Sequence, residues 1–112
     1  LTEFPISLRN FKNLITLDLS DNKITGQISQ EELGLWRDLR NLNLSHNFLT
    51  RVVQIQLMKL DVLDLHSNLL QGPLVVPPHG ANMTFFSVSH NSPSSFLSLS
   101  NCCSHCLEWS FL

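Results

Sequence analysis

Three cysteines and a histidine lie close together near the end of the chain and could bind a metal ion or carry redox chemistry. They are Cys102, Cys103, His105 and Cys106. A structural zinc site usually takes its four ligands as two spaced pairs, and directly adjacent cysteines are poorly placed to bind one ion. The sequence supplies no second pair, no strand–helix–strand context for a redox Cys-x-x-Cys, and Leu107 where haem attachment would need histidine. We therefore predict no metal site and no cofactor.

The histidines are the other candidates for catalysis. The five are His46, His66, His79, His90 and His105. In the register derived below, His46 and His90 occupy equivalent positions two strands apart. At ~4.8 Å per strand they lie too far apart to share a proton, and His66 lies one position earlier in its own copy. No Gly-x-Ser-x-Gly motif and no glycine-rich phosphate loop occurs. We predict that the chain is not an enzyme and interpret the histidines as solvent-facing.

A repeated pattern provides the elements that would position these side chains. The pattern Leu-x-x-Leu-x-Leu-x-x-Asn begins at Leu14, Leu39 and Leu60, and a weaker copy begins at Met83. A period of roughly 20–29 residues with this pattern is typical of leucine-rich repeats. Within each copy, Leu-x-Leu is a short strand with both leucines on one face, and stacked copies bury them. We predict an α/β right-handed leucine-rich-repeat solenoid with about four parallel strands on its concave face and an irregular or 3₁₀ convex side.

The asparagine that closes each copy is expected to be structural. These residues are Asn22, Asn47, Asn68 and Asn91. A buried amide is tolerated only when its donors and acceptors are paired. We expect a ladder in which these side chains bond the backbone of adjacent turns. Gly26 and Gly72, four residues after their asparagines, are expected to adopt positive φ so that the chain can reverse.

Two linking segments are expected on the convex side. Residues 5–14 carry an apolar residue at every third position, which favours a 3₁₀ segment over a strand. Residues 29–38 could form a short helix. Trp36, three residues before the next copy, is expected to pack in the core rather than to bind a ligand.

The turns after two copies have a distinctive sequence. Residues 24–29 read Ile-x-Gly-x-Ile-Ser, and residues 70–75 read Leu-x-Gly-x-Leu-Val. Both are similar to the plant-specific repeat ending Leu-x-Gly-x-Ile-Pro. Residues 63–74, Leu-Asp-Leu-His-Ser-Asn-Leu-Leu-Gln-Gly-Pro-Leu, resemble the extracellular repeats of plant leucine-rich-repeat receptor-like proteins. The resemblance covers residues 1–91.

The chain departs from that family at three turn positions, with Ser29 and Val75 in place of the usual proline and Arg51 in place of the usual glycine. The resemblance implies a non-enzymatic segment that binds a peptide, glycan or protein ligand in defence or developmental signalling. The parent protein would lie on the extracellular side of the plasma membrane, with its anchor outside this chain, and would act through a co-receptor kinase. The alternatives are a receptor kinase ectodomain, a soluble inhibitor of an enzyme in the cell wall, and a non-functional truncated product.

Length and charge limit the other possibilities. A chain of 112 residues with a net charge of −2 and 14% charged residues gives no electrostatic argument for binding nucleic acid or a membrane surface. No apolar run approaches the ~20 residues needed to span a bilayer. Leu1 begins in the middle of a copy, so we expect a piece of a longer protein. We divide it into about four uncapped repeats at residues 1–91 and an unpatterned Cys/Ser-rich tail at residues 92–112, which we hypothesise comes from a shifted reading frame or a retained intron.

The outward-facing residues of the strands form the candidate ligand-binding surface. We expect four columns on the concave face, which we call columns one to four: Thr16, Asn41, Val62 and Phe85; Asp18, Asn43, Asp64 and Ser87; Ser20, Ser45, His66 and Ser89; Asp21, His46, Ser67 and His90. An uncovered sheet face needs polar residues, so most of these are also explained by structure alone. Val62 and Phe85 are the only apolar pair, and we predict that they contact the ligand.

Two Asn-x-Ser/Thr triplets could accept N-linked glycans. They begin at Asn43 and Asn82. Asn43 lies between two inward leucines and should point outward from the concave face. A glycan there would block a ligand nearby, so either the site is unused or that strand does not contact the ligand.

Overall fold

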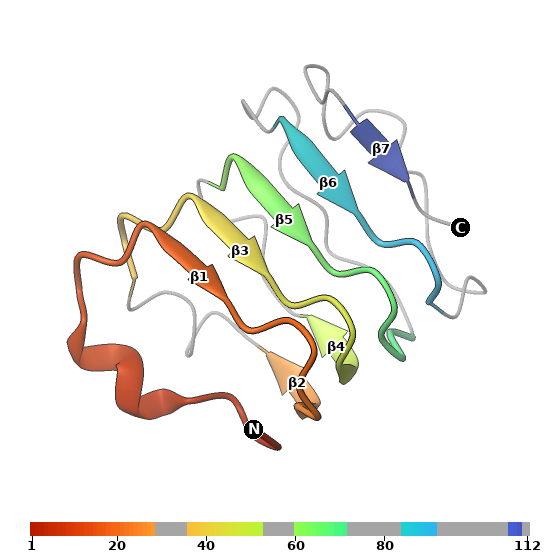
Figure 1. Cartoon of the computed structure of the whole chain (residues 1–112), viewed down its shortest axis with the longest axis horizontal. Helices are drawn as coiled ribbons and strands as arrows, with labels where there is room; N and C mark the ends of the chain where they lie inside the picture. Colours follow the sequence, from red (N-terminus) through yellow and green to blue (C-terminus); the bar gives the residue numbers. More distant parts are fainter. Residues whose placement is uncertain (29–35, 53–59, 72–83, 92–107, 111–112) are drawn as a thin grey trace.

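The computed structural model describes residues 1–28, 36–52, 60–71, 84–91 and 108–110 (Figure 1). Several predictions therefore lie outside the described residues. These are positive φ at Gly72, the glycosylation site at Asn82, and the surroundings of His79, His105 and the cysteines. Most of the short helix expected at residues 29–38 also lies outside them, and its last three residues, 36–38, are described and are not helical.

Five short strands form one parallel sheet. They are β1 (Thr16–Asp18), β3 (Asn41–Asn43), β5 (Val62–Asp64), β6 (Phe85–Ser87) and β7 (Glu108–Ser110), side by side in that order (Figure 1). The predicted register is confirmed, because Leu17, Leu42, Leu63 and Phe86 align across the first four strands. The expectation of about four strands was too low. Residues in the tail, which we took to be unpatterned, supply β7, in which Trp109 aligns with Phe86.

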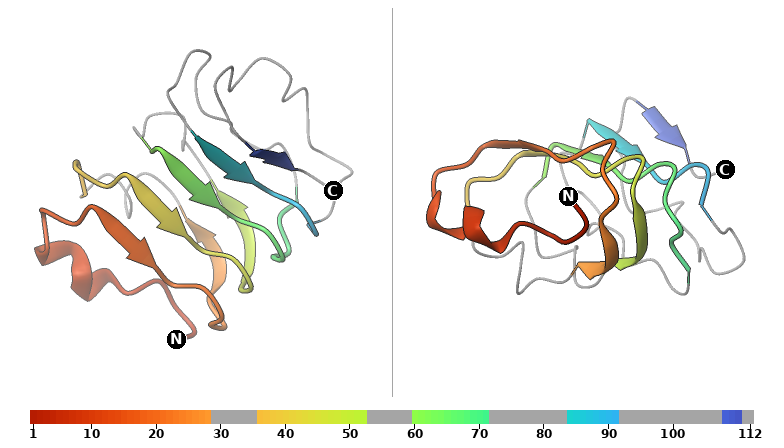
Figure 2. Two further views of the ribbon diagram at one scale, coloured as in Figure 1. Left: turned by 45° about the horizontal axis from the view of Figure 1, so that its top comes forward. Right: turned by 60° about the horizontal axis from the view of Figure 1, so that its bottom comes forward.

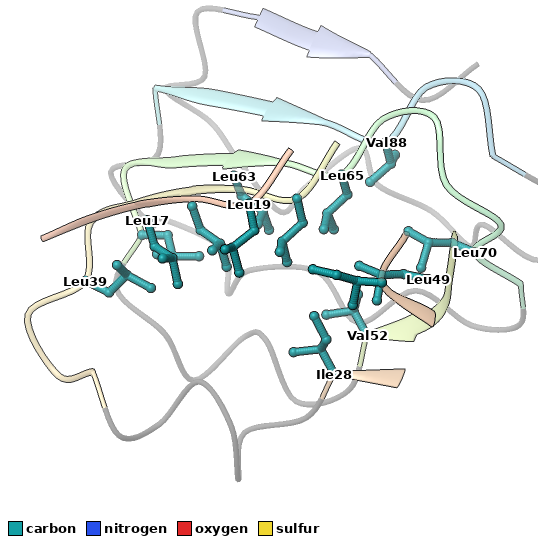
Figure 3. Close-up of a cluster of buried hydrophobic side chains, with 14 of the residues drawn as sticks. Leu17, Leu19, Ile28, Leu39, Leu49, Val52, Leu63, Leu65, Leu70 and Val88 are labelled. Carbon is teal, nitrogen blue, oxygen red and sulfur yellow. The ribbon is translucent and has the colours of Figure 1, made fainter. Parts of the chain in front are cut away.

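The core lies beneath this sheet (Figure 3). Each of the strands β1, β3, β5 and β6 sends one apolar side chain inward, and a second follows two residues later. Leu63 and Leu65 have no exposed surface, and Leu17 and Leu19 in the first repeat are 8% and 7% exposed. Burying each leucine contributes about 1.5–3 kcal/mol. A single repeat could not shield its own leucines, so the fold depends on stacking.

A second, smaller sheet was not expected. It pairs β2 (Thr25–Ile28) with β4 (Phe48–Val52) in parallel. Gly26 has the positive φ that we predicted, +84°. The register shifts between Gly26 and Gln27, so that Thr50 is left as an extra residue on β4. The Thr50 hydroxyl donates to the carbonyl of Gly26 at 3.1 Å, which stabilises this bulge.

The described part of the convex side agrees with the prediction. Residues Ile6–Asn10 form the 3₁₀ helix η1, which follows Pro5. Trp36 is a core residue, as expected, with 2% of its surface exposed. Its indole Nε1 donates to the carbonyl of Leu8 in η1 at 3.1 Å, and its ring lies 5.6 Å from that of Phe4. This tryptophan therefore joins η1 to the second repeat. In the described residues, no helix has the length and apolar character needed to cross a bilayer.

Candidate functional site

The outward face of the five-stranded sheet is the candidate site. Figure 2 shows the chain turning away from the ends of the strands toward β2 and β4, so that no described segment crosses this face. Column one aligns as predicted, from Thr16 through Asn41 and Val62 to Phe85, and column two runs from Asp18 through Asn43 and Asp64 to Ser87. The sheet therefore brings the predicted residues into two continuous rows.

Columns two and three bond to each other at the end of each strand. The Oδ1 atom of Asp18 accepts from the backbone N–H of Ser20 at 2.9 Å and from its hydroxyl at 2.6 Å. Asn43 accepts the same two bonds from Ser45, at 3.0 and 2.7 Å. These Asx turns hold the chain as it leaves the sheet. Part of the polar surface predicted for ligand contact is therefore engaged in local structure.

Two residues of the predicted contact set are nearly fully buried. Ser45 is 2% exposed and Ser87 is 4% exposed. The Ser45 hydroxyl is turned back onto Asn43, and the Ser87 hydroxyl lies 3.3 Å from that of Ser89. Both side chains are therefore covered, and neither can contribute a large area to a ligand contact.

The Asx turn in the first repeat has an electrostatic consequence. The hydroxyl of Ser20, and then its backbone N–H, stabilise the ionised carboxylate and lower the pKa of Asp18 from 3.8, while slight burial opposes the shift. Asp18 therefore remains a carboxylate in mildly acidic solution and keeps a negative charge at this end of the concave face.

The residues of column four share a backbone conformation that the repeat pattern did not predict. Asp21, His46, Ser67 and His90 all adopt left-handed backbone conformations, with φ between 55° and 57°. This turn directs the next residue, the ladder asparagine, into the interior. The backbone N–H of His46 donates to the carbonyl of His66 in the next repeat at 3.0 Å. Aspartate and histidine adopt positive φ more readily than most residues. Their presence in column four was the feature of the sequence that could have predicted this conformation.

The asparagine side chains connect each turn to the one before it. Asn47 is 4% exposed, and its Nδ2 donates to the carbonyl of Leu19 in the preceding repeat at 3.0 Å. Its Oδ1 accepts from the N–H of Ile24 at 3.0 Å. Asn68 and Asn91 make the corresponding bonds one and two repeats later. Asn22, in the first repeat, donates only within its own turn and accepts from the amino terminus.

One pair of histidines comes together across repeats, and His66, which we expected to face solvent, is only partly exposed. In the third repeat histidine takes the place of the Asx-turn serine. Its Nδ1 lies 2.5 Å from Oδ1 of Asp64, and only 28% of the His66 side chain is exposed. Its Nε2 lies 3.1 Å from Nε2 of His46 in the second repeat. This contact runs diagonally between columns three and four, so comparing His46 with His90 within one column does not find it.

Val62 and Phe85 lie directly opposite each other on β5 and β6. Both are half-buried, so each presents part of an apolar side chain on the open face. Farther along column one, Asn41 donates from Nδ2 to the hydroxyl of Thr16 at 3.2 Å. The side chains of Val62 and Phe85 have no hydrogen-bonding groups. The part of their surface that is exposed is available for contact with a ligand.

The glycosylation triplet at Asn43 lies within this face. The side chain is half-buried, and its Oδ1 accepts two bonds from Ser45, the third residue of the triplet. A glycan on Nδ2 would start from column two. Glycosylation of Asn43 stays a prediction.

Among the described residues, no group of three or more His, Cys, Asp or Glu side chains is placed to hold a metal ion.

Comparison with known proteins gives a family match and several plant relatives. A family model described as "Leucine Rich Repeat" matches residues 13–34. Receptor-like protein 7 of Arabidopsis thaliana is 39% identical over 98 residues, which cover 82% of this chain and 10% of the relative. Receptor-like protein 6 of the same plant is 37% identical over 108 residues, covering 91% of this chain and 10% of the relative. Receptor like protein 27, also of Arabidopsis thaliana, is 34% identical over 106 residues, which cover 91% of this chain and 13% of the relative.

The chain thus spans about a tenth of the length of these relatives. No solved structure matches it. An alignment that covers 91% of the chain is longer than residues 1–91 alone and must extend into the tail. A shifted reading frame or retained intron as the origin of residues 92–112 stays a hypothesis.

Proposed function

The chain belongs to the plant leucine-rich-repeat receptor-like proteins, and on this basis we propose that its concave face binds a peptide, glycan or protein ligand without enzymatic chemistry. In the parent protein this segment lies on the extracellular side of the plasma membrane. Ligand binding is passed on through a co-receptor kinase, in a defence or developmental response. Val62 and Phe85 are the proposed contact residues of this segment.

The observation that carries the proposal is the open sheet face with an apolar pair at its centre. Val62 and Phe85 align on neighbouring strands, and column two beside them is held by Asx turns at Asp18, Asn43 and Asp64. A rigid frame lowers the ordering cost of binding. Aromatic side chains at such positions commonly supply a large share of the contact energy.

The test compares two phenylalanines in the complete parent protein. Phe85→Ser removes the aromatic contact from the concave face. Phe48→Ser is the control, because Phe48 is a phenylalanine with 47% of its surface exposed that lies on β4 in the other sheet. The parent and both variants are expressed in leaf tissue, with surface abundance measured, and challenged with microbial culture filtrates and with plant cell-wall digests.

The proposal predicts a filtrate- or digest-induced association with a co-receptor kinase that Phe85→Ser reduces at least tenfold and Phe48→Ser leaves unchanged. Association that depends equally on both phenylalanines would indicate a general folding defect and would contradict the assignment. Association unaffected by Phe85→Ser would place ligand contact elsewhere in the parent protein.

A further inference from the structure

We propose that His46 and His66 form a binding site for a divalent transition-metal ion of the zinc or copper class, which bridges the second and third repeats. The proposal does not depend on the ligand-binding function above. It comes from the one place in the described residues where two imidazole rings meet. Their Nε2 atoms are 3.1 Å apart, and their ring centroids are 4.7 Å apart with an interplanar angle of 82°.

The separation of the nitrogens is that of two ligands of one metal ion. With a metal–nitrogen bond of roughly 2.0–2.1 Å, two imidazole nitrogens lie roughly 2.9 Å apart at a right angle and roughly 3.3 Å apart at a tetrahedral angle. The observed 3.1 Å falls between these values. Imidazole is a good ligand for zinc, copper and nickel and a poor one for magnesium or calcium.

Asp64 prepares His66 for this role. An ionised carboxylate only accepts hydrogen bonds, so the contact between Oδ1 of Asp64 and Nδ1 of His66 places the proton of the neutral ring on Nδ1. The lone pair is then on Nε2, which faces His46. A carboxylate on the far nitrogen of a ligating histidine fixes its tautomer and raises its basicity. The Asp64 side chain is 15% exposed, so this orientation is sheltered from water.

His46 can supply the second ligand by a change of tautomer. Without a metal, its Nε2–H donates to Nε2 of His66. With a metal, its proton moves to Nδ1 through solvent, and the lone pair on Nε2 binds the ion. His46 is exposed, so this exchange is open to water. The two remaining tetrahedral positions are left to water or to a donor group on a bound partner.

The site is tested by titrating the full 112-residue chain with Zn²⁺ alone and measuring heat release and the ¹⁵N shifts of the histidine rings. The three cysteines are first replaced by serine, because thiolates bind zinc as well. We expect one zinc ion per chain and shifts at Nε2 of His46 and His66. His46→Gln and His66→Gln should each weaken binding at least tenfold, and Asp64→Asn by about 10–100-fold, the usual effect of removing such a carboxylate.

His90→Gln is the matched control, since His90 shares column four and its left-handed backbone with His46 (φ 57° and 55°). It should leave zinc affinity unchanged. Circular dichroism shows whether each variant folds, and if His66→Gln does not, the exposed His46 carries the test. Affinity unchanged in His46→Gln, or zinc-dependent shifts confined to His79, His90 or His105, would overturn the proposal.

Discussion

The side-chain Oδ1 of Asn68 accepts a hydrogen bond from the backbone N–H of Leu49, 3.0 Å away and one repeat earlier. Its Nδ2 donates at the same time to the carbonyl of Leu44 in that repeat, at 2.9 Å. One buried amide thus satisfies two backbone groups of another turn. Asn68→Ala leaves these groups without partners and should lower the free energy of unfolding by about 1–3 kcal/mol. Urea denaturation of the chain measures this change.

Asn22→Ala provides the comparison within the same ladder. Asn22 is only part-buried, and its amide donates to Leu19 and Ser20 in its own turn. Its loss should therefore be less destabilising than that of Asn68. Equal destabilisation by the two substitutions would mean that the bonds between repeats add nothing to the bonds within a turn.

Gly26 is a separate test of backbone strain. It has φ of +84°, and a Cβ atom built there would meet nothing within 4 Å. Gly26→Ala should therefore cost about 1–2 kcal/mol from the left-handed conformation alone, without a clash. Gln27→Ala, at the next and equally exposed position of β2, should have little effect in the same urea experiment. A Gly26→Ala variant as stable as the parent chain would show that the turn can rearrange.

The Asx turn at Asp18 predicts a pH dependence with a definite sign. The pKa of Asp18 is lowered from 3.8 by the hydroxyl and backbone N–H of Ser20. A carboxyl with a depressed pKa in the folded state stabilises the fold above its unfolded pKa, and this stabilisation is lost as pH falls through the folded value. The window therefore lies below about 3.8.

Ser20→Ala removes the larger cause and should raise the pKa of Asp18 part of the way back, since the backbone donor remains. An NMR titration of the side-chain carboxyl carbon measures it. Ser45→Ala is the control, because the same serine position in the second repeat faces Asn43, which does not titrate. An Asp18 titration that is the same in Ser20→Ala and the parent chain would contradict the assigned cause.

The structure could be predicted from the sequence wherever the same pattern recurs from one repeat to the next. The spacing of leucine and asparagine predicted the alignment of Leu17, Leu42 and Leu63, because side chains alternate strictly along a strand and a slip of one residue would expose the core. Positive φ at Gly26 and burial of Trp36 were predicted for equally local reasons. In these cases the alternation of side chains within a repeat and the stacking of the repeats favour the same structure.

The features that were missed depend on differences between repeats. The β2–β4 sheet needs a bulge at Thr50, which the repeat pattern does not encode. The contact of His46 with His66 arises because histidine replaces a shorter serine in one Asx turn and its ring reaches the neighbouring repeat. Comparing columns straight across the strands could not find it. Strand β7 has tryptophan in register with Phe86, at the position where the pattern asks for leucine, so it was assigned to an unpatterned tail.

The proposed ligand contact of Val62 and Phe85 is the central claim, and site-specific photo-crosslinking tests it most directly. A photoreactive phenylalanine analogue is placed at position 85, or at position 48 as the control, in the complete parent protein, which is then exposed to the culture filtrates and wall digests. The proposal predicts a defined crosslinked ligand from position 85 and none from position 48. Crosslinking from position 48 alone, or equal crosslinking from both, would contradict a ligand site on the concave face of this segment.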